Sequence, residues 1–135
     1  MSIRVALVED DDDIRRQTVA CLNAEPDIEC VGEYGTAEDL IAAMDRIRPD
    51  VVLMSIGLPG QDGIAGVRQL KPLYPSVEFV MFTAHDSLVL EAMQAGATGY
   101  LIKPELPEKL IAAVREVINI LFCCILGSMR CFTPL

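Results

Sequence analysis

The stretch of sequence that decides the fold is Pro49-Asp50-Val51-Val52-Leu53-Met54-Ser55-Ile56-Gly57-Leu58-Pro59-Gly60. Its continuous apolar run, Val51 to Met54, predicts a central strand that is buried on both faces. The run stops at Ser55, and the glycines and the proline that follow indicate a long loop. A strand of this kind is typical of a parallel sheet with helices packed on both of its faces.

Short apolar runs alternate with segments of helical periodicity on either side of this strand. The other strands are expected at residues 3–8, 28–34, 77–82 and 100–102, and the helices at about 14–25, 36–47, 64–70, 87–95 and 107–121. Five strands that alternate with five helices predict an α/β fold with a doubly wound, five-stranded parallel sheet and right-handed crossovers. Ligands of such folds bind beyond the carboxyl ends of the strands, where the strand order reverses.

The length and the charge limit what the chain does. Its 135 residues correspond to one domain, which we place at residues 1–119, followed by an atypical apolar tail at residues 120–135. The 20 acidic and 11 basic residues give a formal net charge of -9. Because phosphate backbones repel an acidic surface, we expect no direct nucleic-acid contact by this domain.

The cysteines and the apolar segments indicate the compartment. The chain has five cysteines and one histidine, with no CxxC pair, which argues against a zinc site. The odd number of cysteines and the lack of a signal peptide favour free thiols in the cytoplasm. The longest strongly apolar run, at residues 117–126, is too short to span a bilayer, so we expect no membrane attachment.

Polar side chains follow four of the predicted strands where each strand ends. Glu9 and Asp10 follow the first strand, Ser55 the third, Thr83 the fourth and Lys103 the fifth. Two adjacent carboxylates repel each other, and Mg²⁺, which prefers oxygen ligands, relieves that repulsion. A hydroxyl and an ammonium group opposite the carboxylates suit the oxygens of a phosphoryl group. The sequence therefore predicts a site for Mg²⁺ and phosphate at one edge of the sheet.

Five motifs surround these strand ends in order along the chain. They are Val8-Glu9-Asp10-Asp11, Pro49-Asp50-Val51-Val52-Leu53-Met54, Gly57-Leu58-Pro59-Gly60-Gln61-Asp62-Gly63, Phe82-Thr83-Ala84 and Gly99-Tyr100-Leu101-Ile102-Lys103-Pro104. With these motifs the sequence resembles the receiver domains of bacterial response regulators. The resemblance runs in register from about Ile3 to Val117 and is nearest to receivers of the LuxR/NarL kind, which have the flavodoxin-like fold of CheY.

The resemblance implies a role for each residue of the edge. Glu9 and Asp10 would bind Mg²⁺ together with the backbone carbonyl of Gly57. Thr83 would donate a hydrogen bond to a phosphoryl oxygen, and Lys103 would pair with the same group. Receivers catalyse their own phosphorylation and dephosphorylation, so the chain would have no separate enzymatic activity.

The resemblance also implies a switch and partners. Tyr100 would swing inward on activation, coupled to Thr83, although it could instead be simply a half-buried aromatic of the strand. The face made by the fourth helix, the fifth strand and the fifth helix would bind partners, including a second copy of the chain. The expected upstream partner is a sensor histidine kinase or a phosphotransfer protein, and the expected output is transcriptional. Pro104 would follow a cis peptide bond.

Ser55 is a departure from the family pattern. It stands after Leu53-Met54, where receivers carry the acceptor aspartate. A serine hydroxyl is neutral and less reactive than a carboxylate, so phosphotransfer by the usual route should fail and Mg²⁺ affinity should drop. Either Ser55 is a natural or engineered substitution that prevents phosphorylation, or it accepts phosphate slowly or from another class of kinase.

Two other functions compete with the signalling switch. One is a phosphatase of the aspartyl-phosphate class, for which Asp10 is the only close candidate nucleophile. The other is a phosphate-independent interaction module, a pseudo-receiver that has dropped both Mg²⁺ and phosphate.

The tail at residues 120–135 lacks the polar linker expected before an output domain, and it could be an altered end, a packing segment or a dimer contact.

Overall fold

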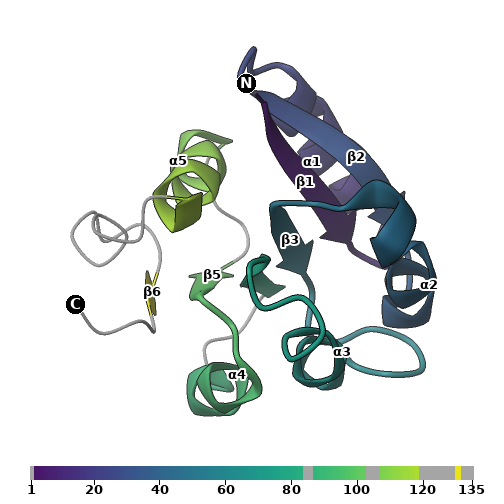
Figure 1. Cartoon of the computed structure of the whole chain (residues 1–135). Coiled ribbons are helices and arrows are strands. Elements are labelled where there is room, and N and C mark those ends of the chain that lie inside the picture. The colour runs from purple at the N-terminus through teal and green to yellow at the C-terminus, as the bar shows by residue number, and fades with distance from the viewer. Residues whose placement is uncertain (1, 84–86, 103–106, 119–129, 132–135) are drawn as a thin grey trace.

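The computed structural model describes residues 2–83, 87–102 and 107–118, and the backbone of 130–131 (Figure 1). Strands and helices alternate over nearly all of this part. The elements are β1 (Ile3–Val8), α1 (Asp12–Asn23), β2 (Ile28–Tyr34), α2 (Ala37–Ile47), β3 (Val51–Met54), α3 (Gly63–Leu70), β4 (Glu78–Thr83), α4 (Val89–Ala95), β5 (Gly99–Ile102), α5 (Pro107–Ile118) and β6 (Arg130–Cys131).

The strands form one sheet in the order β2-β1-β3-β4-β5-β6. The first five of these are parallel, which confirms the predicted doubly wound fold. The strand order reverses between β1 and β3, so the carboxyl ends of these two strands mark the expected position of a site. The two-residue strand β6 pairs antiparallel with β5 and was not predicted. A two-residue pairing leaves too little alternation in the sequence to be recognised.

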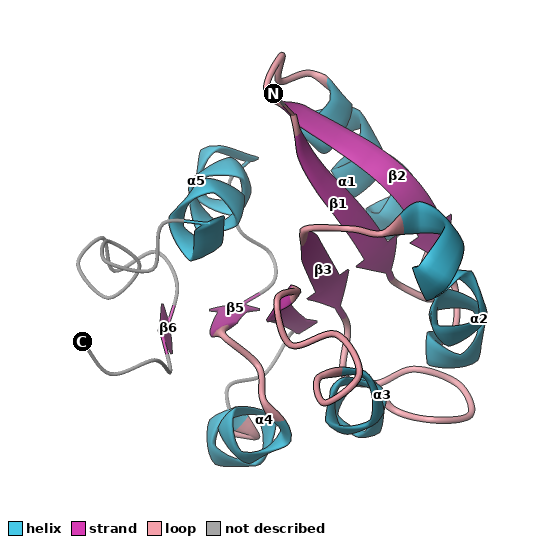
Figure 2. Cartoon of the chain, viewed as in Figure 1, coloured by secondary structure: helices cyan, strands magenta, loops and turns pink. Residues whose placement is uncertain are grey.

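Helices cover both faces of the sheet, and successive strand residues point to opposite faces (Figure 2). In β3, Val52 and Met54 join the core under α2, α3 and α4, whereas Val51 and Leu53 join the core under α1 and α5. All four of these side chains are completely buried. The unbroken apolar run that predicted a central strand therefore reflects burial on both faces.

Side-chain capping explains where the first helix begins. The Oδ1 atom of Asp11 accepts hydrogen bonds from the backbone N–H groups of Asp13 and Ile14, at 2.9 and 3.0 Å. The helix therefore begins at Asp12, two residues earlier than its apolar spacing predicts. The fourth helix begins at Val89, two residues later than predicted, and no side chain caps it at Leu88.

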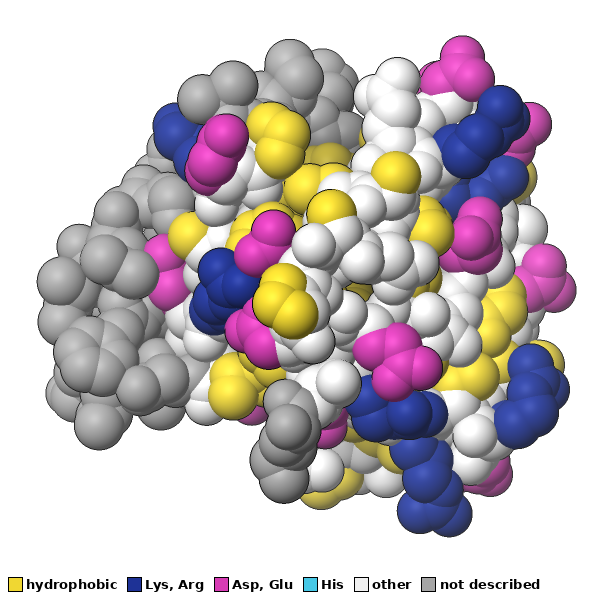
Figure 3. Space-filling view, turned by 90° about the horizontal axis from the view of Figure 1, so that it is seen from above, with side chains coloured by type: hydrophobic (Ala, Val, Ile, Leu, Met, Phe, Trp, Pro, Cys, Tyr) yellow, Lys and Arg dark blue, Asp and Glu magenta, His cyan; other side chains and the backbone are white. Residues whose placement is uncertain are grey.

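Several predictions fall outside the described residues. These are the phosphate-pairing role of Lys103, the cis bond before Pro104 and the role of most of the tail at residues 120–135. Within the described part of the chain, no helix is long and apolar enough to cross a bilayer. On the face shown in Figure 3, acidic side chains are interspersed with basic ones.

Candidate functional site

Strands β1, β3 and β4 end side by side, and this brings Glu9, Ser55 and Thr83 to one edge of the sheet. Val8 pairs with Met54, and Met54 pairs with Met81 on the next strand. The backbone N–H of Ser55 donates to the carbonyl of Val8 at 3.0 Å, which continues the pairing one step past β3. The residues after β1 and β3 are therefore held side by side by the backbone.

Ser55 and Glu9 form a direct hydrogen bond at this edge. The Oγ atom of Ser55 donates to Oε1 of Glu9 over 2.8 Å, and both residues are buried, with exposed fractions of 3% and 2%. A buried carboxylate needs hydrogen-bond donors because burial removes it from water. The hydroxyl of Ser55 meets that requirement, and the two residues are brought together although 46 positions separate them in the sequence.

The start of α1 supplies two more donors to Glu9. The backbone N–H of Asp11 donates to Oε2 of Glu9 at 3.1 Å, and Nη1 of Arg15 donates to the Glu9 carbonyl oxygen at 2.7 Å. Hydrogen bonding to Asp12 raises the pKa of Arg15, against a smaller opposing effect of burial. Arg15 thus stays charged beside the acidic edge. Sequence reasoning missed Arg15, although it lies only one helical turn beyond Asp11.

Asp10, Thr83 and Tyr100 take different positions around this edge. Asp10 follows Glu9 and is exposed to solvent. Thr83 ends β4 and is buried. The side chain of Tyr100 is 1% exposed and belongs to the core that α2, α3 and α4 cover. Tyr100 is therefore buried rather than half-buried, and its role as a switch stays a prediction.

The loop after β3 contains Gly57 and is anchored from α2. Gly57 is exposed, and a Cβ atom added to it would meet nothing within 4 Å. The backbone N–H of Gln61 donates to Oε2 of Glu38 at 3.1 Å. Gly60, with a φ of 73°, lies against the same carboxylate. Glu38 is a second residue that sequence reasoning missed, because a lone glutamate early in a helix carries no signal for a distant loop.

The residues expected to hold Mg²⁺ do not fit a cation well as they are placed. Both carboxylate oxygens of Glu9 already accept hydrogen bonds from the chain itself. In the described ranges, no group of three or more His, Cys, Asp or Glu side chains could hold a metal ion. Since position 55 carries a hydroxyl, the edge lacks the third carboxylate that the family resemblance implies.

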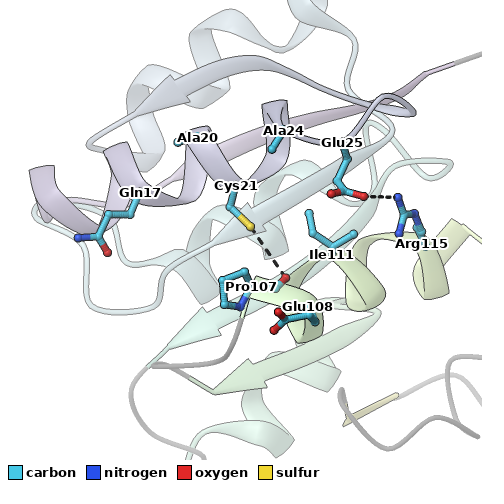
Figure 4. Close-up of a pocket in the computed structure, with 9 residues that line it drawn as sticks. All are labelled: Gln17, Ala20, Cys21, Ala24, Glu25, Pro107, Glu108, Ile111 and Arg115. Carbon is cyan, nitrogen blue, oxygen red and sulfur yellow. Dashed lines mark hydrogen bonds and ion pairs between the residues drawn. The ribbon is translucent and has the colours of Figure 1, made fainter.

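A separate groove of about 550 Å³ lies between α1 and α5 (Figure 4). None of the predicted site residues that the structure describes lines it. The Sγ atom of Cys21 lies 3.9 Å from the carbonyl oxygen of Pro107, and the desolvation of this thiol, with Glu25 and Glu108 nearby, raises its pKa. Cys21 is a free thiol and is partly buried.

Arg115 connects this groove to the loop before β2. Its guanidinium group contacts Glu25 and Asp27, each at 2.7 Å, and makes a second bond to Asp27 at 3.0 Å. The hydrogen bonds from Arg115 lower the pKa of Asp27. These contacts join α5 to the end of α1, but they lie apart from the carboxyl edge of the sheet.

Known proteins resemble this chain over most of its length. The chain is 38% identical over 115 residues to the transcriptional regulatory protein YxjL of Bacillus subtilis, covering 84% of this chain and 53% of that protein. It is 34% identical over 117 residues to the DNA-binding transcriptional activator DevR/DosR of Mycobacterium tuberculosis, covering 85% and 54%. The chain spans about half the length of the curated relatives it matches.

The solved structures and the family match agree with these relatives. A two-component response regulator of the LuxR family from Aurantimonas superposes with a TM-score of 0.83 at 27% identity, covering 88% of this chain and 86% of that one. Residues 5–115 match the response regulator receiver domain. This chain therefore belongs to the response regulator receiver domain family.

Proposed function

We propose that this chain is the receiver module of a two-component phosphorelay pathway and that Ser55 occupies the position of the acceptor aspartate. The usual phosphotransfer is lost in consequence. The observation that carries the proposal is the contact of Ser55 with Glu9. A hydroxyl here ends the central strand and lies 2.8 Å from a buried carboxylate. This is where the carboxyl ends of β1 and β3 meet, which is the expected ligand position in a doubly wound sheet.

The chemistry of serine supports the loss of phosphotransfer. A carboxylate attacks a phosphoryl donor without first losing a proton, whereas a hydroxyl must be deprotonated as it attacks. We therefore propose that the chain has no phosphotransfer activity of its own by the usual route.

The metal site is weakened for the same reason. Receiver domains typically bind Mg²⁺, and carboxylates are the strongest ligands that such a site offers. Here Ser55 replaces a negative charge, while Glu9 and Asp10 keep theirs. We propose that Mg²⁺ still approaches this edge but binds more weakly than it would beside three carboxylates.

The proposed partners follow from the family and from the exposed apolar side chains. The upstream partner would be a sensor histidine kinase or a phosphotransfer protein in the cytoplasm, where Cys21 and Cys30 stay as free thiols. The output would be transcriptional, as the names of the relatives state for those proteins. Leu90 and Met93 on α4 are exposed and support a partner-binding or homodimer face made by α4, β5 and α5.

The experiment that tests this proposal is intact-mass analysis after incubation with acetyl phosphate and Mg²⁺. The chain itself, Ser55→Asp and Ser76→Asp are compared. Ser76 lies in an exposed turn before β4, so Ser76→Asp is a matched control for the added carboxylate. We expect only Ser55→Asp to gain one phosphoryl group.

Two outcomes would contradict the proposal in different ways. If the unsubstituted chain gains a phosphoryl group, Ser55 or another residue accepts phosphate, and the silent-receiver function is wrong. If Ser55→Asp gains none, the edge has lost more than its acceptor, and a phosphate-independent interaction module is the better function.

A further inference from the structure

Ser55 and Glu9 hold the ends of two adjacent strands together by a side-chain contact as well as by the backbone. Ser55 follows β3, and Glu9 follows β1. Their side chains are joined at 2.8 Å in a buried position, next to the backbone bond from Ser55 to Val8. An aspartate at position 55 would bring a second carboxylate against Glu9 at the same place.

Two carboxylates so close and so buried repel each other strongly, because the protein interior screens charge less than water does. A bound divalent cation relieves such repulsion, and the fold then depends on that cation for part of its stability. Ser55 removes the second charge and adds a donor in its place. A hydrogen bond from a neutral donor to a charged acceptor is stabilising without any ion.

We infer that the hydrogen bond from Ser55 to Glu9 makes this edge of the sheet independent of divalent cations. The inference rests on the proposed function, because it takes position 55 as the former acceptor position. It goes further by assigning the serine a structural role. Ser55 is thus a stabilising replacement for a cation site, in addition to being an inactive acceptor.

The other contacts of Glu9 support this role. Its second oxygen accepts the Asp11 N–H, and Arg15 binds its carbonyl oxygen. A cation that approached Oε1 of Glu9 would have to share that oxygen with the hydroxyl proton of Ser55. The positive end of the hydroxyl dipole points at the same oxygen. Mg²⁺ also gives up its water ligands reluctantly, so a carboxylate that the chain already satisfies competes poorly for it.

Thermal unfolding with and without Mg²⁺ tests the inference. The chain, Ser55→Asp, Ser76→Asp and the double variant Ser55→Asp/Glu9→Gln are each melted in EDTA and in about 10 mM MgCl₂. We expect the Tm of the chain and of Ser76→Asp to change by less than about 1 °C between the two conditions. We expect Ser55→Asp to melt about 5 °C below the chain in EDTA and to recover most of that difference in MgCl₂.

The double variant shows whether charge repulsion is the cause. Glu9→Gln keeps the size of the side chain and removes its charge, so the double variant, which retains Asp10, should lose most of the response to MgCl₂ that Ser55→Asp shows. An undiminished response in the double variant would overturn the inference, because the repulsion between Glu9 and position 55 would then not be its cause. Equal responses of the chain and Ser55→Asp, or no response in Ser55→Asp, would also overturn it.

A smaller change keeps the test valid if Ser55→Asp does not fold. Ser55→Ala removes only the hydroxyl and should lower the Tm in EDTA by about 3 °C, with partial recovery in MgCl₂. An unchanged Tm in Ser55→Ala would overturn the inference. If Mg²⁺ raises the Tm of the unsubstituted chain while the chain gains no phosphoryl group, this inference is wrong and the proposed function stands. If the unsubstituted chain gains a phosphoryl group, the proposed function is wrong whatever the Tm.

Discussion

The Cα atom of Gly63 lies so close to the backbone of Ser55 that a Cβ atom would stand 1.9 Å from the Ser55 carbonyl oxygen. The same atom would also lie 2.9 Å from Cγ of Met54. Only a residue without a side chain allows α3 to begin this close to the end of β3. The contact fixes the loop between these elements, including Gly57, against the candidate site.

Gly63→Ala is therefore expected to destabilise the protein by about 3 kcal/mol, because rigid backbone atoms must move to admit the methyl group. Gly57→Ala is the matched control from the same loop. Gly57 has open space around its Cα and no positive φ, so its substitution should change the stability by less than about 0.5 kcal/mol. Urea denaturation measures the free energy of unfolding of both variants. Equal values for Gly63→Ala and Gly57→Ala would show that the start of α3 lies farther from the backbone of Ser55 in solution.

Tyr100→Ala should destabilise the protein by about 3 to 5 kcal/mol, since it leaves a cavity in the core under α4. Tyr100 is one of the largest fully buried side chains and packs in a core with Met81 and Ala92. Tyr100→Phe keeps the ring and should cost about 1 kcal/mol or less. Chemical denaturation compares the two variants. A loss below about 1 kcal/mol in Tyr100→Ala would mean that the ring is exposed in solution, and that the inward position is not its resting state.

The contact of Arg115 with Asp27 should stabilise the protein only while Asp27 is ionised. Arg115 lowers the pKa of Asp27 in the folded state, so the contact contributes stability at neutral pH. That contribution begins to decline at the ordinary pKa of an aspartate, about 4, and is lost as the pH falls through the lower pKa of Asp27 in the folded state. Arg115→Gln should therefore lower the Tm by roughly 1 to 3 °C at neutral pH, and the difference should vanish in acid.

The control for this prediction is Arg68→Gln, which removes an exposed arginine from α3. Its Tm should stay near that of the unsubstituted chain at both pH values. Melting curves recorded at neutral pH and near pH 2, below the lowered pKa of Asp27, provide the comparison. A difference for Arg115→Gln that persists in acid would mean that packing of the side chain, rather than the ion pair, stabilises α5 against α1.

Much of the fold could be predicted because its signals are local. The run Val51 to Met54 predicted β3 with the bounds that the structure has, since a strand buried on both faces must be apolar at every position. The start of α1 was predicted two residues late. Five consecutive acidic residues, 9–13, look alike in sequence, and only the backbone geometry selects Asp11 as the cap.

The sequence by itself determined the alternation of strands and helices, the parallel sheet and the edge at which polar residues collect, because periodicity and strand ends are properties of short segments. Only the tertiary structure decided which of those residues touch. The pairing of β1 with β3 brings Ser55 to Glu9 across 46 positions, while Asp10 stays exposed one residue away. Adjacent residues point in different directions at a strand end. The register of the sheet therefore decides that Glu9, and not Asp10, accepts the hydrogen bond from the Ser55 hydroxyl.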